Sequence, residues 1–395
     1  MAVKRIFFIV LDSFGIGYAP DADKFGDFGS NTLKSIMTSN EFETPNMKKI
    51  GFFVPEIKNC GPVNVVFNII SFRNKNVFDI QLIAIRKNNI GYEKNIQKQC
   101  SLGIIYMENY PDKNIFFNHL NDLDIIHSHG YFPDKYIKFI NNNIVKITTI
   151  HCLFFNDYIK EYGFFKGLVG AIMHLYFLKN NHFSKIVGCS KSIEEYLTKF
   201  IQKEKLSNIN NGVNQNIFKP LSIEDRILVR KELGFKIDES IFIFAGRFIK
   251  RKNVSKLIEI FNTQNFDNSK LLLLGEGEEE DICKEKAKNN PNILFLGFNN
   301  TPEKYYQLAD FVVSVSSAEG YPMSILEAVS CGCYAYLSDI PSHREFLKNN
   351  PSCGDFIENI SNYKSLEKNH SNKSYYNLSA QKMSKEYTKI YIEEL

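Results

Sequence analysis

Short apolar runs alternate with longer helical segments along the chain from Lys48 onward. The runs in the first half read "KKIGFFV", "PVNVVFNIISF", "FDIQLIAI", "GIIYM", "DIIHSHG", "VKITTIHC" and "KIVGCS". They are rich in β-branched and aromatic residues, which favours strands. Because β-rich runs that alternate with helices are typical of a parallel sheet with crossover connections, we expect an open α/β domain here.

The alternation restarts after "NNGVNQNIFKP" and the charged segment "LSIEDRILVRKELGFKIDES". The new runs are "IFIFAGRF", "KLLLLGEG", "NILFLGF", "FVVSVSS" and "YAYLSDI", and they predict a second doubly wound domain. Near the C-terminus, Met383, Tyr387, Ile390 and Tyr391 form one apolar stripe, which predicts an amphipathic helix docked on another element. Two such domains would bind a ligand where the carboxyl ends of their strands face one another.

The most membrane-like stretch is "FFKGLVGAIMHLYFLK", residues 164–179. Lys166 and His174 interrupt it, and it is shorter than the ~20 apolar residues that cross a bilayer. Two interpretations stay open: a core helix with one solvated edge, or an interfacial helix that touches a membrane surface.

Composition narrows the class of protein. A chain of 395 residues with 44% hydrophobic residues suits two or more domains with a sizeable core. A formal net charge of +4 is too weak to predict a nucleic-acid partner. The cysteines form no C-x-x-C pair, and the apolar run after Lys4 and Arg5 is short for a signal peptide. We therefore expect a reduced, cytoplasmic protein.

The stretch "SSAEGYPMSILEAVSCG" carries the most chemistry. Glu319 follows a predicted strand, and Glu327 lies in a helix that begins near Pro322. The free amides of Met323 and Ser324 would lie in the first helical turn and favour an anion, which predicts a phosphate site. Glu327 could accept hydrogen bonds from a diol such as ribose, while Glu319 could face the group that the phosphate carries.

A second stretch, "FAGRFIKRKN", places Arg247 and Lys252 after another predicted strand. Both could neutralise a diphosphate; the alternative is a solvated basic loop that includes Lys250 and Arg251. Beside the acidic pair, the phosphate interpretation is favoured.

Through these motifs, residues 47–395 resemble a retaining glycosyltransferase of family four. The GT-B architecture of that family has two facing Rossmann-like domains. "GRFIKRKN" matches the family's G-R-x-x-x-x-K and "EGYPMSILEAVSCG" its E-x7-E, with support from "LLLLGEGEEE", "NILFLGF", "INNGVNQNIFKP" and "DIIHSHG". The resemblance implies an acceptor domain at 47–212, a nucleotide-sugar domain at 213–372, a cleft between them, and a helix within 373–395 that crosses back to the first domain.

The same resemblance implies roles for single residues. Arg247 and Lys252 would bind the donor diphosphate and Glu327 its ribose. Glu319 and the Gly320 amide would face the donor sugar, and His129 would line the sugar side, whereas a structural role is favoured for His127. The further donor-binding positions are Gly61, Gly246, Met323 and Ser324.

Three positions depart from the family's pattern. Cys60 and Gly61 stand where the family has a glycine pair, Asn64 stands where a basic residue is common, and Asn253 replaces a usual glycine. These departures bear on the acceptor and on fine donor choice.

The implied activity is metal-independent transfer of a hexose with retained anomeric configuration. The expected donor is a UDP-linked sugar, the expected acceptor a glycan or a lipid-linked sugar in surface polysaccharide synthesis, and no cofactor beyond the donor substrate is expected. A membrane-borne acceptor would place the protein peripherally at the inner face of the membrane. A non-catalytic module that binds nucleotide sugars remains the alternative.

Residues 1–53 resemble the start of phosphopentomutase, through "KRIFFIVLDSFGIGYAPDADKFGDFGSNTLKSI" and "TPNMKKIGF". That resemblance implies that Asp12 matches a manganese ligand, but the family's later motifs do not follow, so Asp12 is expected to be orphaned and no metal site is predicted. We interpret residues 1–46 as an incomplete, fused or misassembled leader, with Met47 as the first position of the glycosyltransferase. A working phosphopentomutase is the alternative.

Overall fold

The computed structural model describes residues 47–88, 91–264, 266–365 and 378–395. Lys48–Leu395 forms one compact unit. The leader predicted at residues 1–46, with Asp12, lies outside the described residues, so the fold below is that of Lys48–Leu395.

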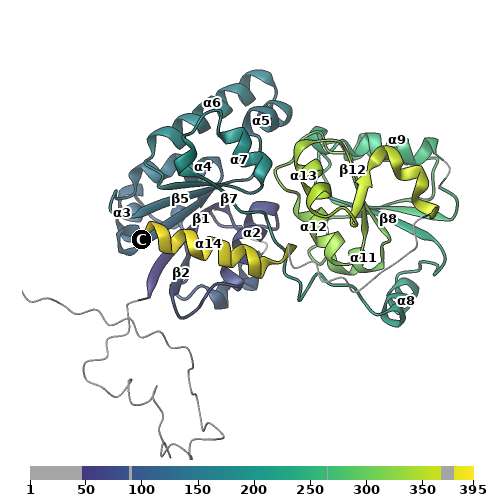
Figure 1. Cartoon of the computed structure of the whole chain (residues 1–395), viewed down its shortest axis with the longest axis horizontal. Helices are drawn as coiled ribbons and strands as arrows, with labels where there is room; N and C mark the ends of the chain where they lie inside the picture. The colour runs from purple at the N-terminus through teal and green to yellow at the C-terminus, as the bar shows by residue number, and fades with distance from the viewer. Residues whose placement is uncertain (1–46, 89–90, 265, 366–377) are drawn as a thin grey trace, which may run out of the picture. The chain divides into compact units, whose positions relative to one another are not determined.

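The first sheet of the described chain has seven parallel strands in the order β3-β2-β1-β4-β5-β6-β7 (Figure 1). Its strands are β1 (Lys48–Glu56), β2 (Phe78–Arg86), β3 (Ile104–Tyr106), β4 (Ile125–His129), β5 (Val145–Ile150), β6 (Lys185–Gly188) and β7 (Leu206–Asn208). Helices accompany these strands as α2 (Gly61–Ser71), α3 (Lys113–His119), α4 (Tyr131–Tyr136), α5 (Phe154–Tyr162), α6 (Phe164–Asn180) and α7 (Lys191–Leu197).

The second sheet has six parallel strands within the described residues, in the order β10-β9-β8-β11-β12-β13. These are β8 (Ser240–Ala245), β9 (Ser269–Leu274), β10 (Ile293–Gly297), β11 (Phe311–Ser314), β12 (Tyr334–Leu337) and β13 (Gly354–Phe356). The accompanying helices are α8 (Ile223–Glu232), α9 (Val254–Thr263), α10 (Glu280–Ala287), α11 (Glu303–Leu308), α12 (Met323–Ser330) and α13 (Pro341–Asn349). Two doubly wound parallel sheets confirm the predicted α/β, GT-B-type fold class.

The last helix, α14 (Ala380–Glu394), packs on the first sheet's part of the chain, beside α2 (Figure 1). The Ser384 hydroxyl donates to the Ile69 carbonyl at 2.9 Å, and the Tyr391 hydroxyl lies 2.8 Å from His127 Nδ1. The stripe predicted from Met383, Tyr387, Ile390 and Tyr391 is buried here. The four domain boundaries remain a prediction.

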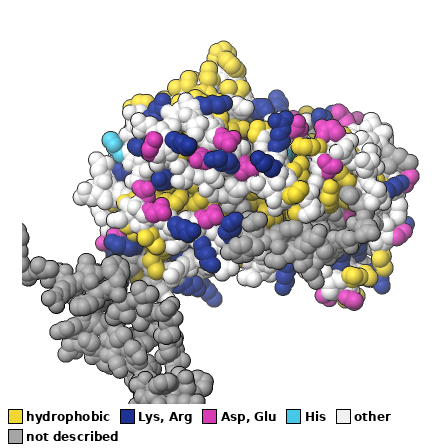
Figure 2. Space-filling view, in the orientation of Figure 1, with side chains coloured by type: hydrophobic (Ala, Val, Ile, Leu, Met, Phe, Trp, Pro, Cys, Tyr) yellow, Lys and Arg dark blue, Asp and Glu magenta, His cyan; other side chains and the backbone are white. Residues whose placement is uncertain are grey.

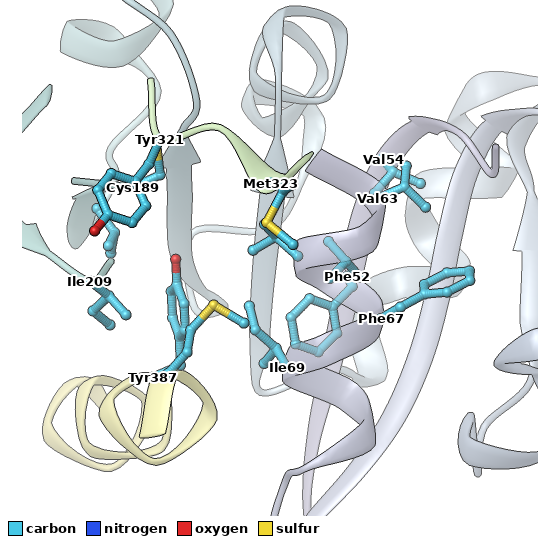
Figure 3. Close-up of a cluster of buried hydrophobic side chains, with 14 of the residues drawn as sticks. Phe52, Val54, Val63, Phe67, Ile69, Cys189, Ile209, Tyr321, Met323 and Tyr387 are labelled. Carbon is cyan, nitrogen blue, oxygen red and sulfur yellow. The ribbon is translucent and has the colours of Figure 1, made fainter. Parts of the chain in front are cut away.

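The core beneath α14 joins residues from several elements (Figure 3). It brings together Phe52 of β1, Ile69 of α2, Tyr387 of α14 and Met323 at the start of α12. A separate cluster that includes Phe242, Phe261 and Phe311 packs within the second sheet's part of the chain.

One predicted strand is wrong. The run "PVNVVFNIISF" forms helix α2, with Pro62 in its first turn, where the missing N–H costs no hydrogen bond. Six of its apolar residues are buried, because α2 packs among the first sheet and α14. A short helix that is apolar on most sides looks like a buried strand in sequence. The strands β7 and β13, three residues each, were not predicted at all.

Among the residues described, no helix combines the length and the apolar character that crossing a bilayer requires.

Candidate functional site

Glu319 gathers two cations in the loop between β11 and α12. Arg251 donates from a terminal guanidinium nitrogen to Glu319 Oε2 at 2.9 Å, and Lys252 Nζ donates to Oε1 at 2.5 Å. Both cations come from a 3₁₀ turn, Lys250–Lys252, that follows β8. Burial alone would raise the pKa of Glu319, but Lys252 and Arg251 outweigh it and hold that pKa at about 2. The carboxylate and the two cations form what we call the Glu319 cluster.

Two glycines shape the loops around this cluster. A Cβ on Gly275, which has φ +132°, would lie 1.9 Å from the Gly246 carbonyl oxygen. The loops after β8 and β9 therefore touch backbone to backbone, which only glycine permits at this position. A Cβ on Gly246 would lie 3.6 Å from Lys252 Cε, so the lysine stem runs past Gly246 on its way to Glu319.

Arg247 is more exposed than the cluster and points to a different carboxylate. Both of its terminal nitrogens donate to Oε1 of Glu161, at the end of α5, at 3.1 Å. The charge of Arg247 still acts on the cluster. Burial is the main cause that lowers the pKa of Lys252, and the positive charges of Arg251 and Arg247 lower it further. The negative charge of Glu319 opposes this shift. The predicted pair of Arg247 and Lys252 thus lies in one electrostatic neighbourhood, and of these two cations Lys252 is the one that donates to Glu319.

Asp157 of α5 also lies close to the Glu319 cluster. Its Oδ2 accepts from the Leu153 amide at 3.1 Å, and its buried Oδ1 has no hydrogen-bond partner among the described residues. Burial raises the pKa of Asp157 to about 6, with the charge of Arg251 opposing and that of Glu319 adding to the shift. The sequence analysis missed this residue, because nothing in its local pattern links α5 to a loop of the second sheet.

Glu327 forms a second polar group inside α12. The Tyr306 hydroxyl donates to its Oε2 at 3.3 Å, and burial raises the pKa of Glu327 to about 7. The charge of Glu327, after burial, contributes to raising the pKa of Tyr92, whose hydroxyl donates to Asn64 at 2.8 Å. The charge of Glu327 therefore acts on a residue from the first sheet's part of the chain, while its hydrogen bond is to Tyr306.

The start of α12 lies against the start of α2. A Cβ on Gly61 would lie 3.7 Å from Met323 Cγ, which is buried, whereas Ser324 is half-buried. Pro322 is the N-cap and supplies no side-chain cap to the first-turn amides. Those amides keep the anion-binding potential of an uncapped helix end.

At Gly320 the loop that carries Glu319 approaches the backbone that follows β5 of the first sheet closely. A Cβ there would lie 2.1 Å from the His151 carbonyl oxygen, so no other residue fits without a backbone shift. The Ser190 hydroxyl donates to the Gly320 carbonyl at 3.0 Å, and the Asn211 amide donates to the Tyr321 carbonyl at 2.9 Å. The Glu319 cluster is thereby anchored beside the strand ends of β5 and β6.

The two histidines of β4 differ in what their rings can do. Both ring nitrogens of His127 are used, by Tyr391 and by Thr149 at 2.8 Å, as a structural role requires. His129 Nδ1 lies 2.9 Å from His151 Nε2, and its buried Nε2 has no partner in the described part of the chain. Burial lowers the pKa of His129 well below its ordinary value and that of His151 to about 4, so both rings are neutral.

Within the described ranges, no group of three or more His, Cys, Asp or Glu side chains is placed to hold a metal ion.

Two family models match adjacent parts of the chain. Residues 108–216 match "Glycosyltransferase Family 4", and residues 225–370 match "Glycosyl transferases group 1". The first range includes His129, Asp157 and Glu161, and the second includes Arg247 and the Glu319 cluster.

Curated relatives extend the likeness. The chain is 26% identical over 307 residues to an O-antigen biosynthesis glycosyltransferase, WclY, of Escherichia coli, which covers 76% of this chain and 82% of that protein. It is 25% identical over 233 residues to a capsular polysaccharide biosynthesis glycosyltransferase, CapH, of Staphylococcus aureus, covering 54% and 65%. A phosphopentomutase of Lachnoclostridium phytofermentans is 57% identical over 51 residues, which is 13% of each chain.

Solved structures share the fold. Anabaena HepE, in complex with UDP and glucose, gives a TM-score of 0.71 at 14% identity and covers 88% of this chain and all of that one. Sucrose-phosphate synthase from Thermosynechococcus elongatus gives 0.68 at 15% identity, covering 88% and 98%. With one glycosyltransferase region in each sheet's part of a GT-B-type fold, the chain is a GT-B glycosyltransferase.

Proposed function

We propose that the protein transfers a hexose from a UDP-linked donor to a glycan or lipid-linked acceptor, with retention at the anomeric carbon, in the synthesis of a surface polysaccharide. The names of WclY and CapH support the polysaccharide class of product. The HepE structures, which hold UDP, glucose and UDP-glucose on the same fold, support the donor class.

The Glu319 cluster carries this proposal. Two largely buried cations, Arg251 and Lys252, converge at the carboxyl ends of β8 and β11, with Arg247 nearby. A donor diphosphate could take up the charge of Lys252 and Arg247, while Glu319 keeps the lysine positioned. Cations already in place need no rearrangement as negative charge develops on the leaving group, so they lower the barrier to its departure.

The proposed step needs no group from outside the donor and the acceptor. The bond from the anomeric carbon to the diphosphate oxygen breaks, and the acceptor oxygen forms its bond to that carbon on the same face. The acceptor's hydroxyl proton passes to the departing diphosphate. Glu319, with its charge balanced by Arg251 and Lys252, orients the cations in this scheme, and Glu327 would accept hydrogen bonds from the ribose hydroxyls. Metal independence is part of the proposal.

The test is a turnover screen of the full chain across UDP-sugars, with UDP release and the anomeric configuration of the product measured. Lys252→Ala should lower kcat/KM about 10²-fold, as loss of one preorganised donor does. Lys250→Ala, which removes an exposed lysine two residues away, should leave it near the parent value.

Four outcomes would count against the proposal. An inverted product would exclude retention, and equal turnover of the Lys250 and Lys252 variants would exclude the role of the cluster. Donor binding by calorimetry without turnover for any acceptor would favour a binding module. Manganese-dependent isomerisation of ribose phosphate that is lost in Asp12→Asn would favour the phosphopentomutase alternative.

A further inference from the structure

The outer face of α6 is apolar from Phe165 to Tyr176. Its exposed large hydrophobic residues have between 39% and 82% of their surface accessible. One of them, Phe164, is the first residue of the helix. The other five lie along one face and form what we call the α6 stripe: Phe165, Val169, Ile172, Met173 and Tyr176. We propose that this stripe inserts into the surface of a lipid bilayer.

The spacing of the stripe shows that it is one helical face. Its members follow one another at i, i+4, i+7, i+8 and i+11, whereas the buried face of the same helix uses Gly167, Ala171, His174, Phe177 and Leu178. A helix that packs on its protein through one face normally presents polar residues on the other. In α6 the buried face already packs on the rest of the protein, and the stripe is a second apolar face that is exposed.

The end of the hairpin adds two aromatic rings to the stripe. Gly163, with φ +82°, turns the chain from α5 into α6, and Tyr162 and Phe164 on either side of it are exposed next to Phe165. In the space-filling view, hydrophobic side chains project at the top, where Figure 1 shows α5 and α6 (Figure 2). Aromatic side chains that project from the protein surface can insert into the interfacial region of a lipid bilayer. A second copy of this chain would instead need a complementary face of about 800 Å² per partner.

Charge on the helix agrees with a lipid surface. α6 contains no Asp or Glu, and its two lysines, Lys166 and Lys179, are exposed near opposite ends. Lysines that flank an apolar face keep their stems in the interfacial region and their ammonium groups among anionic headgroups. Because α6 does not qualify as a span, it would lie along the surface and not cross it.

The hairpin also contacts the Glu319 cluster's neighbourhood. Glu161 of α5 accepts from Arg247, and Lys160 Nζ donates to the Ser317 carbonyl at 2.9 Å. If the stripe is bound to a membrane, the membrane surface that carries a lipid-linked acceptor would lie near the proposed transfer site. The inference goes beyond the proposed function and does not depend on it, since binding can be measured without donor or acceptor.

The chain contains no tryptophan, so one introduced tryptophan reports on its own surroundings. In the full chain, Phe165→Trp should show a blue-shifted emission and quenching by brominated lipid when vesicles of phosphatidylcholine and phosphatidylglycerol are added. The matched control is Leu228→Trp, an equally apolar, exposed position on α8, which should show neither. If the emission of Phe165→Trp is neither shifted nor quenched when vesicles are added, the proposal is overturned.

A second variant tests the stripe as the source of affinity. Phe165→Ser with Ile172→Ser removes two exposed apolar side chains, so vesicle binding in a sedimentation assay should fall about tenfold or more. UDP release without vesicles should stay at the parent value, which separates this test from that of the proposed function. Unchanged vesicle binding by the double variant would overturn the proposal. So would sedimentation of the parent as a dimer that the double variant disperses, because the stripe would then be covered by a second copy.

Discussion

Glu327 is the residue at which pH should act on stability. Its pKa in the folded chain is about 7, compared with an ordinary value of 4.5. Between these values the folded protein binds a proton that the unfolded chain does not, so the free energy of unfolding falls as pH rises from 4.5 to 7. Above pH 7 the buried charge costs at most ~3 kcal/mol.

Glu327→Gln should remove this cost while keeping an oxygen acceptor for Tyr306. The variant should match the parent in thermal stability near pH 4.5 and exceed it increasingly up to pH 8. Comparing each variant with its parent at the same pH cancels the opposite contribution of buried histidines such as His151. Glu358→Gln, at an exposed position, should give a flat difference. A flat difference for Glu327→Gln as well would contradict the assigned pKa.

His151 is predicted to act through His129. If the 2.9 Å contact fixes which nitrogen of His129 carries its proton, His151→Ala should lower kcat about tenfold with a smaller effect on KM. The double variant His129→Ala, His151→Ala should be no slower than His129→Ala alone, because His151 acts only through His129 and has no further effect once His129 is gone. His151→Gln, which can still donate a hydrogen bond to Nδ1, should restore part of the rate.

An exposed histidine supplies the control for this pair. His119→Ala on α3 should leave turnover unchanged. Additive losses from the changes at His129 and His151 would mean that the two rings act independently.

At this scale the sequence predicted residues that share a local motif. Glu319 and Lys252 each lie in a recognisable stretch after a strand, and the structure joins them directly. Arg251 had no role in the favoured phosphate interpretation and appeared, with Lys250, only in the alternative of a solvated basic loop. Asp157 and His151 come from the other sheet's part of the chain, so their closeness to the site depends on tertiary packing that no local pattern records.

At the scale of elements, the hydrophobic pattern predicted most strands, and it failed where a short helix is apolar on most sides. The run that became α2 is apolar on most sides, with only Asn64, Asn68 and Ser71 polar, because the sheet and α14 occupy most of its surroundings. In α6, a second apolar side is exposed instead. Periodicity alone cannot separate the two cases, since it records side-chain type and not what covers it.

The α5–α6 hairpin offers a matched pair of glycines in one helix. A Cβ on Gly167 would lie 2.4 Å from the backbone of Ile159 and Tyr158, whereas one on Gly170 would lie 3.4 Å from the Tyr158 ring. Gly167→Ala should therefore destabilise the protein by about 1–3 kcal/mol through overpacking. Gly170→Ala should be neutral or stabilise it by up to ~1 kcal/mol, because alanine is the better helix former.

Denaturant unfolding of the two variants measures this difference. Equal midpoints would show that the helices of the hairpin can separate without loss of stability.

At the scale of the whole described chain, polar contacts tie the second sheet's loops to the first sheet's part. Gly320 and Tyr321 accept from Ser190 and Asn211, and Arg247 pairs with Glu161. Several of these contacts involve residues next to the Glu319 cluster. We therefore predict that movement of one part against the other changes the site itself and, through it, donor binding.

Glu345 of α13 makes the contact best suited to test this link. Its carboxylate accepts from the amides of Lys191 and Ser192, at 2.9 and 2.8 Å, and from the Asn210 side chain at 3.2 Å. Glu345→Ala leaves those amides at the start of α7 without their acceptor, so their hydrogen exchange should become about tenfold faster. Glu358→Ala, an exposed acidic position, is the control.

Donor binding gives the second readout for Glu345. If the contact holds the two parts in the arrangement that binds donor, Glu345→Ala should weaken UDP-sugar affinity severalfold, since part of the binding energy must then restore that arrangement. Faster exchange at Lys191 and Ser192 with unchanged affinity would mean that the contact stabilises α7 only. Unchanged exchange would mean that the carboxylate is not the acceptor of these amides in solution.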